Sequence, residues 1–387
     1  MRIEVLTSLY PSLARPVEGV FAERRWTRMR ARGHEVHVIQ PLPLASRFLP
    51  LARWRETARV PRREVRTGIE VERPRYLHLP GRARRNAGAF ARAGLDALDR
   101  RARPDAVVLD YAWPAAAAAP GLRERRIPCV VSGRGSDVLE VAGEAGLADE
   151  LAAFLRAAGH WCAVSADLVR AMDRLGGANG QGVLVPNGID LELFRPLPRS
   201  EARATLGLAA LDGRLVLVVG HWIERKDPLL ALEAFARGAG ERDRLVFLGR
   251  GPLEARLREG IRARSLEARV ELRAEEPPER LALWYGAADL LLLTSKREGR
   301  PNVVLEALAS GRTVLATEAG GTREVLGALG ERMLARTRDP AELAGRMKAL
   351  LAAQHDPTAL RAVVAHLTWD ASLAALERCL MAAVEDA

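Results

Sequence analysis

Cysteine is scarce in this sequence, which narrows the kinds of site that it can build. The 387 residues include three cysteines, Cys129, Cys162 and Cys379, which lie far apart and form no Cys-x-x-Cys pair. Such a set provides neither the ligand spacing of a structural zinc site nor the framework of a disulfide-rich protein. We therefore expect three reduced, buried thiols.

Long apolar runs are absent as well. No window of about 20 residues is continuously apolar, so the sequence predicts no transmembrane helix. The opening residues, MRIEVLTSLYPS, contain a short apolar run in place of the charged and hydrophobic regions of a secretory signal, and they are typical of a first strand. These features predict a cytoplasmic protein.

Lysine is scarce although the chain is basic, with a net charge of +10. Of the 59 basic side chains, only Lys226, Lys296 and Lys348 are lysines. Nearly all of the positive excess lies in residues 1–195, which hold 31 basic and 22 acidic residues, against 28 and 27 in the remainder. The first half of the chain is therefore the part expected to meet an anionic partner.

Three arginine-rich runs, 23–32, 47–66 and 81–92, carry this excess. This composition favours peripheral contact with an anionic membrane surface, at the inner face of the cell membrane. A solvated, arginine-rich face remains the alternative. No nucleic-acid-reading motif accompanies the charge, so we expect no nucleic-acid partner. The apolar side chains that interleave with the first two runs are Trp26, Phe48, Leu51 and Trp54.

Short apolar runs alternate with helical patterns along the whole chain. This alternation predicts an α/β protein with parallel βαβ units, in which helices cover both faces of each sheet. A chain of this length exceeds one ordinary core, so we expect two doubly wound, Rossmann-like domains. The predicted strands are 3–7, 36–40, 69–73, 106–110, 129–132, 161–164, 183–185, 215–219, 245–248, 270–272, 290–293 and 313–316.

The boundary between the domains is predicted in the stretch VPNGIDLELFRPLPRS, where prolines and a glycine interrupt both periodicities. We place the first domain at residues 1–190 and the second at 191–367. The last segment, 368–387, predicts one amphipathic helix.

Several loops of the second half follow predicted strands and contain glycine, which suits ligand binding at the carboxyl edge of a parallel sheet. After the strand 215–219 come Gly220, Arg225 and Lys226, whose cations suit phosphate oxygens. After the strand 245–248 comes Gly249-Arg-Gly251, which lacks the third glycine of a dinucleotide fingerprint. A further pair, Gly320-Gly321, follows the strand 313–316.

The stretch REGRPNVVLEALASG, residues 297–311, carries two carboxylates eight positions apart. Glu298 is predicted in the loop after a buried strand, and Glu306 in the second turn of a helix that Pro301 begins and Gly311 ends. The amides between the two glutamates then lie near a positive helix end and form an anion cradle. These amides belong to Gly299, Arg300, Asn302 and Val303.

Taken in order, these segments resemble glycosyltransferase family 4, whose members have the GT-B fold. EGRPNVVLE matches the family pattern E-G-x-P-x-x-x-x-E without a gap. VPNGID, VVG with ERKD, GRGPL, AADLLLLTS and AGGTREVL occur in the family's order, and the resemblance spans nearly the whole chain. It implies two domains facing each other across a cleft, with the last helix crossing back to the first domain.

The resemblance also implies roles for individual residues. Glu306 would bind the ribose hydroxyls of a nucleotide-sugar, and Glu298 would contact the transferred sugar. The diphosphate would be held by Arg225, Lys226 and the amides around the start of the helix. The further donor-binding positions implied in this way are Gly19, Gly220, Gly251, Gly299, Pro301, Asn302 and Val303.

For the reaction, the resemblance implies transfer of a sugar from a UDP- or GDP-sugar to a hydroxyl of a glycan or lipid-linked glycan, with retention of configuration. Cell-surface or exopolysaccharide biosynthesis is the expected setting. The sequence contains no Asp-x-Asp triplet, which fits a family that neutralises the diphosphate with protein groups in place of a metal. No metal or cofactor is therefore expected.

The chain departs from the family pattern in two places. His221 stands where many members have an arginine, so Arg225 is expected to carry the charge at the phosphate in its place. Arg134, with Asp137 beyond it, stands where many members have a histidine, on the expected acceptor or sugar side. An arginine is no base at neutral pH, so Arg134 would act through charge or hydrogen bonding.

Other function classes use fewer of these residues. A glycoside hydrolase needs two carboxylates flanking the scissile bond but neither Lys226 nor the glycine loops. A nucleotide-sugar epimerase of the same fold stays open as an alternative, as does a noncatalytic sugar-nucleotide-binding protein. A nucleic-acid-binding protein would be supported only by the charge.

Overall fold

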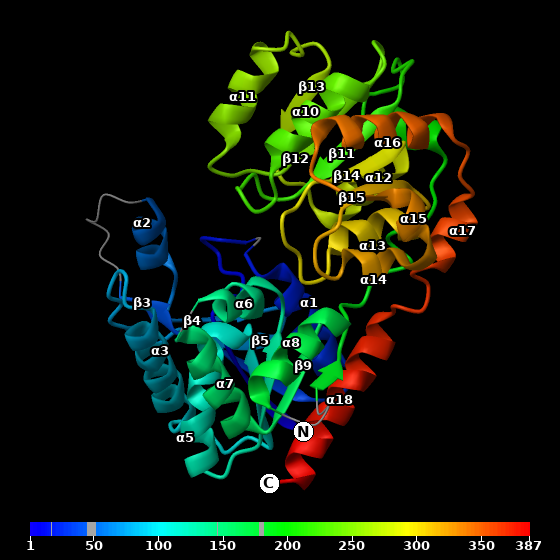
Figure 1. Ribbon diagram of the computed structural model, residues 1–387. Helices are drawn as coiled ribbons and strands as arrows, with labels where there is room; N and C mark the ends of the chain where they lie inside the picture. The colour runs from blue at the N-terminus through cyan, green and yellow to red at the C-terminus, as the bar shows by residue number, and fades with distance from the viewer. Residues whose placement is uncertain (17, 45–51, 145, 178–181) are drawn as a thin grey trace. The chain divides into compact units, whose positions relative to one another are not determined.

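The computed structural model describes residues 1–16, 18–44, 52–144, 146–177 and 182–387 (Figure 1). The chain forms two compact units, one made of Met1–Asn187 with Trp369–Ala387 and the other of Gly188–Thr368. The predicted boundary at residue 190 thus moves to Asn187. Phe48, Leu51 and the side chain of Trp54, which the sequence places in a membrane-facing run, lie outside the described residues.

The N-terminal unit is built on a mostly parallel sheet, in which eight described strands follow the order β10-β9-β8-β7-β1-β2-β5-β4. Only β4 runs antiparallel to its neighbour in this sheet as described. A separate short pair joins β3 to β6. The strands are β1 (Arg2–Thr7), β2 (Glu35–Ile39), β3 (Leu42–Pro43), β4 (Arg63–Arg66), β5 (Ile69–Glu72), β6 (Arg75–Tyr76), β7 (Ala106–Asp110), β8 (Cys129–Gly133), β9 (His160–Ala163) and β10 (Gly182–Leu184).

Helices cover both faces of this sheet. Successive residues of a strand point to opposite faces, so each strand contributes side chains to two cores. Val108 and Val130 pack in one core with α1 and α18, whereas Leu109 and Val131 pack in another with the helices between α3 and α8. The helices are α1 (Val20–Ala31), α2 (Ala52–Arg59), α3 (Ala83–Leu98), α4 (Ala112–Ala115), η1 (Ala116–Ala118), α5 (Ala119–Glu124), α6 (Ser136–Leu139), η2 (Val141–Gly143), α7 (Leu147–Ala158), α8 (Ala166–Gly176) and α18 (Trp369–Glu385).

The C-terminal unit has an entirely parallel sheet, in the order β13-β12-β11-β14-β15-β16. Its core is rich in leucine, and β14 is buried over its whole length. The strands are β11 (Leu215–Val219), β12 (Arg244–Leu248), β13 (Val270–Arg273), β14 (Leu290–Leu293), β15 (Thr313–Thr317) and β16 (Leu334–Ala335).

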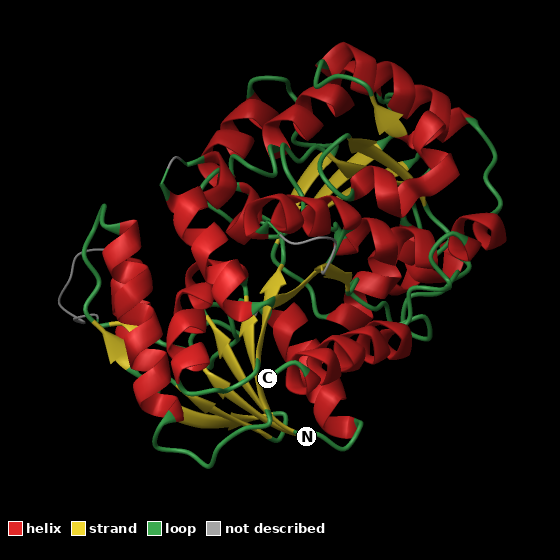
Figure 2. Ribbon diagram, turned by 60° about the horizontal axis from the view of Figure 1, so that its bottom comes forward, coloured by secondary structure: helices red, strands yellow, loops and turns green. Residues whose placement is uncertain are grey.

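The helices of the C-terminal unit surround its strands, as the secondary-structure view shows (Figure 2). They form two packed groups: α10 contacts α11 and α16, whereas α12 contacts α9 and α13. The helices are α9 (Arg199–Thr205), α10 (Pro228–Gly238), α11 (Glu254–Arg262), α12 (Pro278–Ala287), α13 (Asn302–Ala309), α14 (Thr322–Leu326), η3 (Gly327–Leu329), α15 (Gly330–Met333), α16 (Pro340–Ala352) and α17 (Pro357–Ala362).

The predicted α/β class with two parallel, Rossmann-like sheets is confirmed, and every predicted strand is present. The three cysteines are buried and unpaired. In the described part of the chain, no helix is long and apolar enough to cross a membrane.

The membrane interpretation of the run 23–32 is wrong for one of its residues. Trp26 is fully buried in α1, and its indole N–H donates to Asp110 Oδ2 at 3.0 Å. It therefore belongs to the core of the N-terminal unit and is not a surface anchor.

Candidate functional site

Lys226 and Glu298 meet at the carboxyl edge of the C-terminal sheet. The Lys226 ammonium lies 2.6 Å from Glu298 Oε1, although the two residues come from the loops that follow β11 and β14. Ser295 Oγ donates to the same carboxylate oxygen at 2.5 Å. The Glu298 side chain is 6% exposed and that of Lys226 is 22% exposed, so the pair is largely shielded from water. The structure thus brings together two residues predicted from separate motifs.

Close backbone contacts hold the loops after β11 and β12 together. Trp222 N–H donates to the carbonyl of Arg250, and Leu253 N–H donates to the carbonyl of Trp222. A Cβ atom on Gly251 would lie 2.4 Å from that Trp222 carbonyl oxygen, so only glycine fits there. Gly251, a predicted donor-binding residue, is therefore needed for these two loops to pack together.

Glu306 lies on α13 and is 8% exposed. The hydroxyl of Tyr285, a fully buried residue of α12, donates to Glu306 Oε2 at 2.9 Å. The ring of Tyr285 packs edge-on against Phe194 at 5.9 Å between centroids. The hydrogen bond from this tyrosine holds the Glu306 carboxylate in place. Sequence reasoning missed Tyr285, although it precedes a predicted strand by only a few residues.

The loop between Glu298 and α13 is fixed against the loop after β15. A Cβ atom on Gly320 would lie 1.9 Å from the carbonyl oxygen of Glu298, and Gly321 N–H donates to the carbonyl of Gly299. Arg300, 8% exposed, pairs with Glu324 at 2.6 Å. These contacts hold the chain as it enters α13.

The helix α13 begins at Asn302, with Pro301 as its N-cap residue. The start of a helix is its positive end, because the peptide dipoles align along the helix axis. The amides of Asn302 and Val303 therefore stand at the start of the helix whose second turn carries Glu306. This is the arrangement predicted for an anion cradle.

Further basic side chains lie on the same sheet edge. Arg225 donates to the carbonyl of Arg297 at 3.4 Å, which places its guanidinium beside the Glu298 loop. His221 pairs with Glu275 at 3.2 Å, and Arg250 pairs with the same carboxylate at 2.9 Å. His221 thus lies with residues that follow β12 and β13, whereas Arg225 lies with the Glu298 loop.

In the N-terminal unit, Arg134 belongs to a buried polar cluster. Its Nε and Nη2 donate to the two oxygens of Asp110 at 2.8 and 2.9 Å, and its Nη1 donates to Asn187 at 3.0 Å. Arg25 also donates to Asn187, at 3.3 Å. Burial alone would raise the pKa of Asp110, but the charges of Arg134 and Arg25 outweigh it and hold that pKa below its usual value. Sequence reasoning missed Asp110, Arg25 and Asn187.

Asp137 has a structural task in the loop after β8. Its carboxylate accepts hydrogen bonds from the amides of Arg134, Gly135 and Ala112. Burial raises the pKa of Asp137 to about 6, and these amides oppose the rise. The side chain is 3% exposed, so it shapes the loop that carries Arg134.

Gly19 also belongs to the N-terminal unit. It precedes α1 with φ 79°, and a Cβ atom there would lie 2.9 Å from the backbone of Leu9 and Tyr10. Glycine is therefore required locally by both conformation and space.

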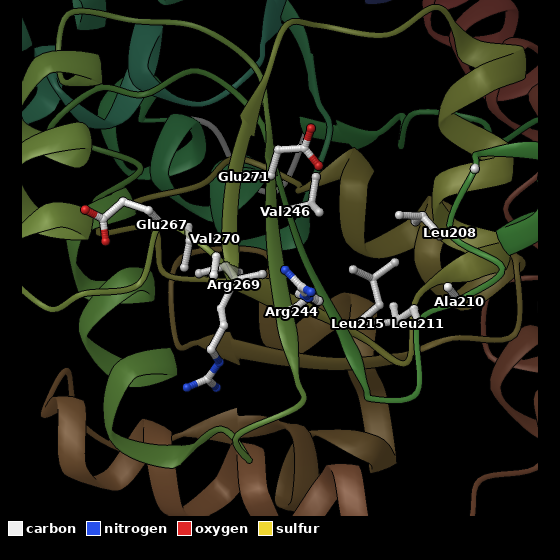
Figure 3. A pocket seen from close by; sticks show the side chains of 13 residues that line it. Leu208, Ala210, Leu211, Leu215, Arg244, Val246, Glu267, Arg269, Val270 and Glu271 are labelled. Carbon is white, nitrogen blue, oxygen red and sulfur yellow. The ribbon is translucent and has the colours of Figure 1, made fainter.

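A hollow of about 400 Å³ lies elsewhere on the C-terminal unit (Figure 3). Leu215, Arg244 and Val270, the first residues of β11, β12 and β13, line it, so it lies at the amino ends of these strands. None of the predicted site residues lines this hollow. Among the described residues, no group of three or more His, Cys, Asp or Glu is arranged to hold a metal ion.

Two families match the chain. Residues 206–363 match Glycosyl transferases group 1, and residues 22–193 match Glycosyltransferase Family 4. The chain is 32% identical over 340 residues to TuaC of Bacillus subtilis (strain 168), whose name describes a glycosyltransferase of teichuronic acid biosynthesis, and the match covers 84% of this chain and 83% of TuaC. It is 34% identical over 202 residues to the D-inositol 3-phosphate glycosyltransferase of Acidothermus cellulolyticus, covering 48% of this chain and 45% of that protein.

Solved structures share the fold. Sucrose-phosphate synthase of Thermosynechococcus elongatus superposes with a TM-score of 0.78 at 21% identity, covering 99% of this chain and 100% of that one. HepE of Anabaena, in complex with UDP and glucose, gives 0.75 at 18% identity with the same coverage. Together with the family matches and the similarity to TuaC, these findings establish that the chain is a GT-B glycosyltransferase of glycosyltransferase family 4.

Proposed function

We propose that the chain transfers a sugar from a UDP- or GDP-sugar to a hydroxyl of a glycan or lipid-linked glycan, with retention of configuration and without a metal. The observation that carries this proposal is the shielded Lys226–Glu298 pair beside the start of α13, with Lys226 Nζ 2.6 Å from the carboxylate. It places a cation, a carboxylate and helix-start amides on one sheet edge, where parallel α/β sheets bind ligands.

The chemistry of the departing group explains this set of residues. As the bond between the sugar C1 and the diphosphate oxygen breaks, negative charge builds on the diphosphate. Lys226, Arg225 and the amides of Asn302 and Val303 stabilise that charge, because they are preorganised where it develops. The acceptor oxygen bonds to C1 on the same face, and its proton passes to the departing diphosphate.

The two glutamates serve as anchors in this proposal. Glu306 binds the ribose hydroxyls, held in place by Tyr285, and Glu298 contacts the hydroxyls of the transferred sugar. Support comes from their spacing on opposite sides of the helix start and from the family pattern that they match. The name of TuaC supports cell-surface polysaccharide synthesis as the setting.

We also propose peripheral membrane contact, at a smaller surface than the three arginine-rich runs of the sequence. Leu44 and Leu77 are 60% and 65% exposed, and they extend the paired strands β3 and β6 side by side, since Leu44 N–H donates to the carbonyl of Tyr76. Arg82 and Arg85 are exposed a few residues further along the chain. We call these four residues the leucine–arginine edge. Exposed leucines with exposed arginines close to them along the chain suit an anionic bilayer surface.

A binding experiment tests directly whether the chain binds a nucleotide-sugar donor. A ligand that binds only the folded chain raises its melting temperature. We expect one of a panel of UDP-, GDP- and ADP-sugars to raise the melting temperature of the wild-type chain and to do so less for Glu306→Ala. If no nucleotide-sugar of the panel, at millimolar concentration, changes the melting temperature of the wild-type chain, the proposed function is contradicted.

A further inference from the structure

Arg338 joins the two loops that carry Lys226 and Glu298. It lies between β16 and α16, outside every motif that the sequence singled out. Its Nη1 donates to the backbone carbonyls of Thr294 and Ser295 at 3.1 and 2.9 Å. Its Nη2 donates to Asp227 Oδ2 at 2.5 Å. One guanidinium thus spans from the loop after β11 to the loop after β14.

The connection to the ion pair is short on both sides. Asp227 follows Lys226 directly in the chain. Ser295, whose carbonyl Arg338 holds, donates its hydroxyl to Glu298 Oε1 at 2.5 Å. Thr294 closes the arrangement, because its hydroxyl lies 3.2 and 2.8 Å from the carbonyl oxygens of Lys226 and Asp227.

Asp227 has a conformation that favours glycine. Its φ of 46° and ψ of 58° lie in the left-handed region, which costs free energy for a residue with a Cβ atom. Its carboxylate also accepts a hydrogen bond from Leu230 N–H at the start of α10, at 3.4 Å. Glycine would make this turn with less strain, so the presence of aspartate indicates that its carboxylate has a task. The pairing with Arg338 provides one.

We propose that Asp227 and Arg338 form a clamp that positions the Lys226 ammonium against Glu298. Arg338 is a positioning residue in this account, since it acts through the two loops and not on the substrate. The consequence for catalysis rests on the proposed function, whereas the geometry of the Lys226–Glu298 pair does not. Without the clamp, fewer contacts hold the Lys226 loop to the Glu298 loop, among them those of the Thr294 hydroxyl with the carbonyls of Lys226 and Asp227, so the two loops can shift more easily. A misplacement of about 1 Å can lower turnover by about a hundredfold.

The scarcity of lysine gives a direct readout of this geometry. The chain has three lysines, of which Lys296 and Lys348 are exposed, whereas Lys226 is paired and shielded. Trace acetylation with acetic anhydride, followed by mass spectrometry, reports the reactivity of each lysine separately. In the wild-type chain we expect Lys226 to react more slowly than Lys348. Loss of the clamp should raise the rate of Lys226 by about threefold or more and leave Lys348 unchanged.

Two clamp variants and one control make the experiment decisive. Asp227→Gly removes the carboxylate but suits the left-handed turn, and glycine is tolerated as an N-cap, so this variant should fold. Arg338→Ala removes the other partner. Arg237→Ala is the matched control, because it deletes a surface ion pair on α10, with Glu233 at 2.8 Å, away from the clamp. Melting temperatures of all three accompany the labelling.

Turnover provides the second readout. We expect kcat to fall about tenfold or more in Asp227→Gly and Arg338→Ala, with little change in the KM for the donor, because Glu306 and its tyrosine are untouched. Arg338→Lys keeps the charge but not the fork of donors, and it should recover part of the lost turnover.

The outcomes separate the clamp from the proposed function. Lys226 labelling in Asp227→Gly that equals labelling in Arg237→Ala would overturn the clamp, whatever the turnover. If Arg338→Ala does not fold, the result for Asp227→Gly decides alone. If the clamp variants expose Lys226 while the wild-type chain transfers sugar from no nucleotide donor, the clamp stands and the proposed function fails.

Discussion

At the scale of single residues, buried partners determine what the candidate site can do. Glu298 meets both a lysine and a serine, and Glu306 meets a tyrosine with no exposed surface. A carboxylate fixed in this way keeps its oxygens in place for a ligand, and the cost of ordering its side chain has been met during folding. The two glutamates differ in their partners, which agrees with two different tasks.

The partner of Glu306 gives a prediction about donor binding. Tyr285→Phe removes one hydrogen bond to Glu306 and keeps the ring packed against Phe194. A hydrogen bond to a charged group contributes about 1.5–3 kcal/mol, so the KM for the donor should rise about tenfold or more while kcat changes little. Steady-state kinetics with varied donor measures this. A donor KM equal to that of the wild type would show that Tyr285 does not act through Glu306.

Sequence patterns identified site residues that lie in motifs. They missed residues whose hydrogen-bond partners are far away in the sequence. Lys226 and Glu298 were predicted because each follows an apolar strand with glycine nearby. Arg338 was missed because it is separated from Asp227 by 111 positions and belongs to no motif. Trp26 was assigned to the surface from its arginine-rich surroundings. The spacing of the buried residues Ala22, Arg25, Trp26 and Met29 was the signal for a core-facing stripe.

At the scale of elements, the last helix stabilises the N-terminal unit. α18 packs against α1 and the sheet, with Leu373, Leu376 and Leu380 buried in the shared core. Arg32, at the end of α1, makes a two-bond contact with Glu377 of α18, with both distances at 2.8 Å. His34 lies 2.9 Å from the same carboxylate. A segment remote in sequence thus covers part of one face of the first sheet.

This contact predicts a dependence of stability on pH. The hydrogen bond from Arg32 holds the pKa of Glu377 at about 2, below its ordinary 4.5. A carboxyl group whose pKa is lowered by folding stabilises the folded state above its ordinary pKa, and it loses this contribution as the pH falls towards the folded value. Because the pair is partly exposed, Glu377→Gln should lower the melting temperature by only about 2–4 °C at pH 7, for a loss of about 1 kcal/mol.

The control for this experiment lies on the same helix. Glu385→Gln changes an exposed carboxylate near the end of α18. The difference between wild type and Glu377→Gln should shrink between pH 4.5 and pH 2, whereas Glu385→Gln should match the wild type throughout. A difference that stays constant over that range would exclude the Arg32–Glu377 pair as its cause.

The length and polarity of a strand decide whether the sequence predicts it. Every strand of four or more buried, mostly apolar residues was predicted, because such runs have few alternatives in an α/β chain. The two-residue strands β3, β6 and β16 were not, since so short a run has no periodicity. The antiparallel β4 was also missed, because Arg63–Arg66 is polar and largely exposed.

At the scale of the whole molecule, the two units carry different chemistry. The C-terminal unit holds the Lys226–Glu298 pair and Glu306, whereas the N-terminal unit holds the basic excess and the exposed leucines. The proposed donor site in one unit and the proposed membrane-binding edge in the other would suit an enzyme that acts on an acceptor at a membrane. This division leads to two predictions about the intact chain.

The first prediction concerns membrane contact. Replacing both leucines of the leucine–arginine edge, Leu44→Glu with Leu77→Glu, should lower the binding constant for phosphatidylglycerol vesicles, measured by co-sedimentation, about a hundredfold or more, since each buried leucine contributes about 1.5–3 kcal/mol. Met381→Glu is the control, because Met381 is also exposed, at 53%, but lies on α18. Wild-type binding that is equal for neutral and anionic vesicles, or unaffected by the double substitution, would exclude this edge as the contact.

The second prediction concerns metal. Because Lys226, Arg225 and helix-start amides are proposed to neutralise the diphosphate, EDTA should leave turnover unchanged. Added Mg²⁺ or Mn²⁺ should not raise it. A rate that falls with EDTA and returns with a divalent cation would contradict metal-independent transfer.

The most direct test of the central claim is the rate of sugar transfer by the wild-type chain, Glu298→Gln and Lys226→Ala, measured with the donor that stabilises the chain best. Lys348→Ala is the matched control, because Lys348 is an exposed lysine on α16. We predict that Glu298→Gln and Lys226→Ala each lower turnover about tenfold or more, whereas Lys348→Ala leaves it unchanged. Wild-type turnover in both site variants would contradict the assignment of this pair as the centre of the reaction.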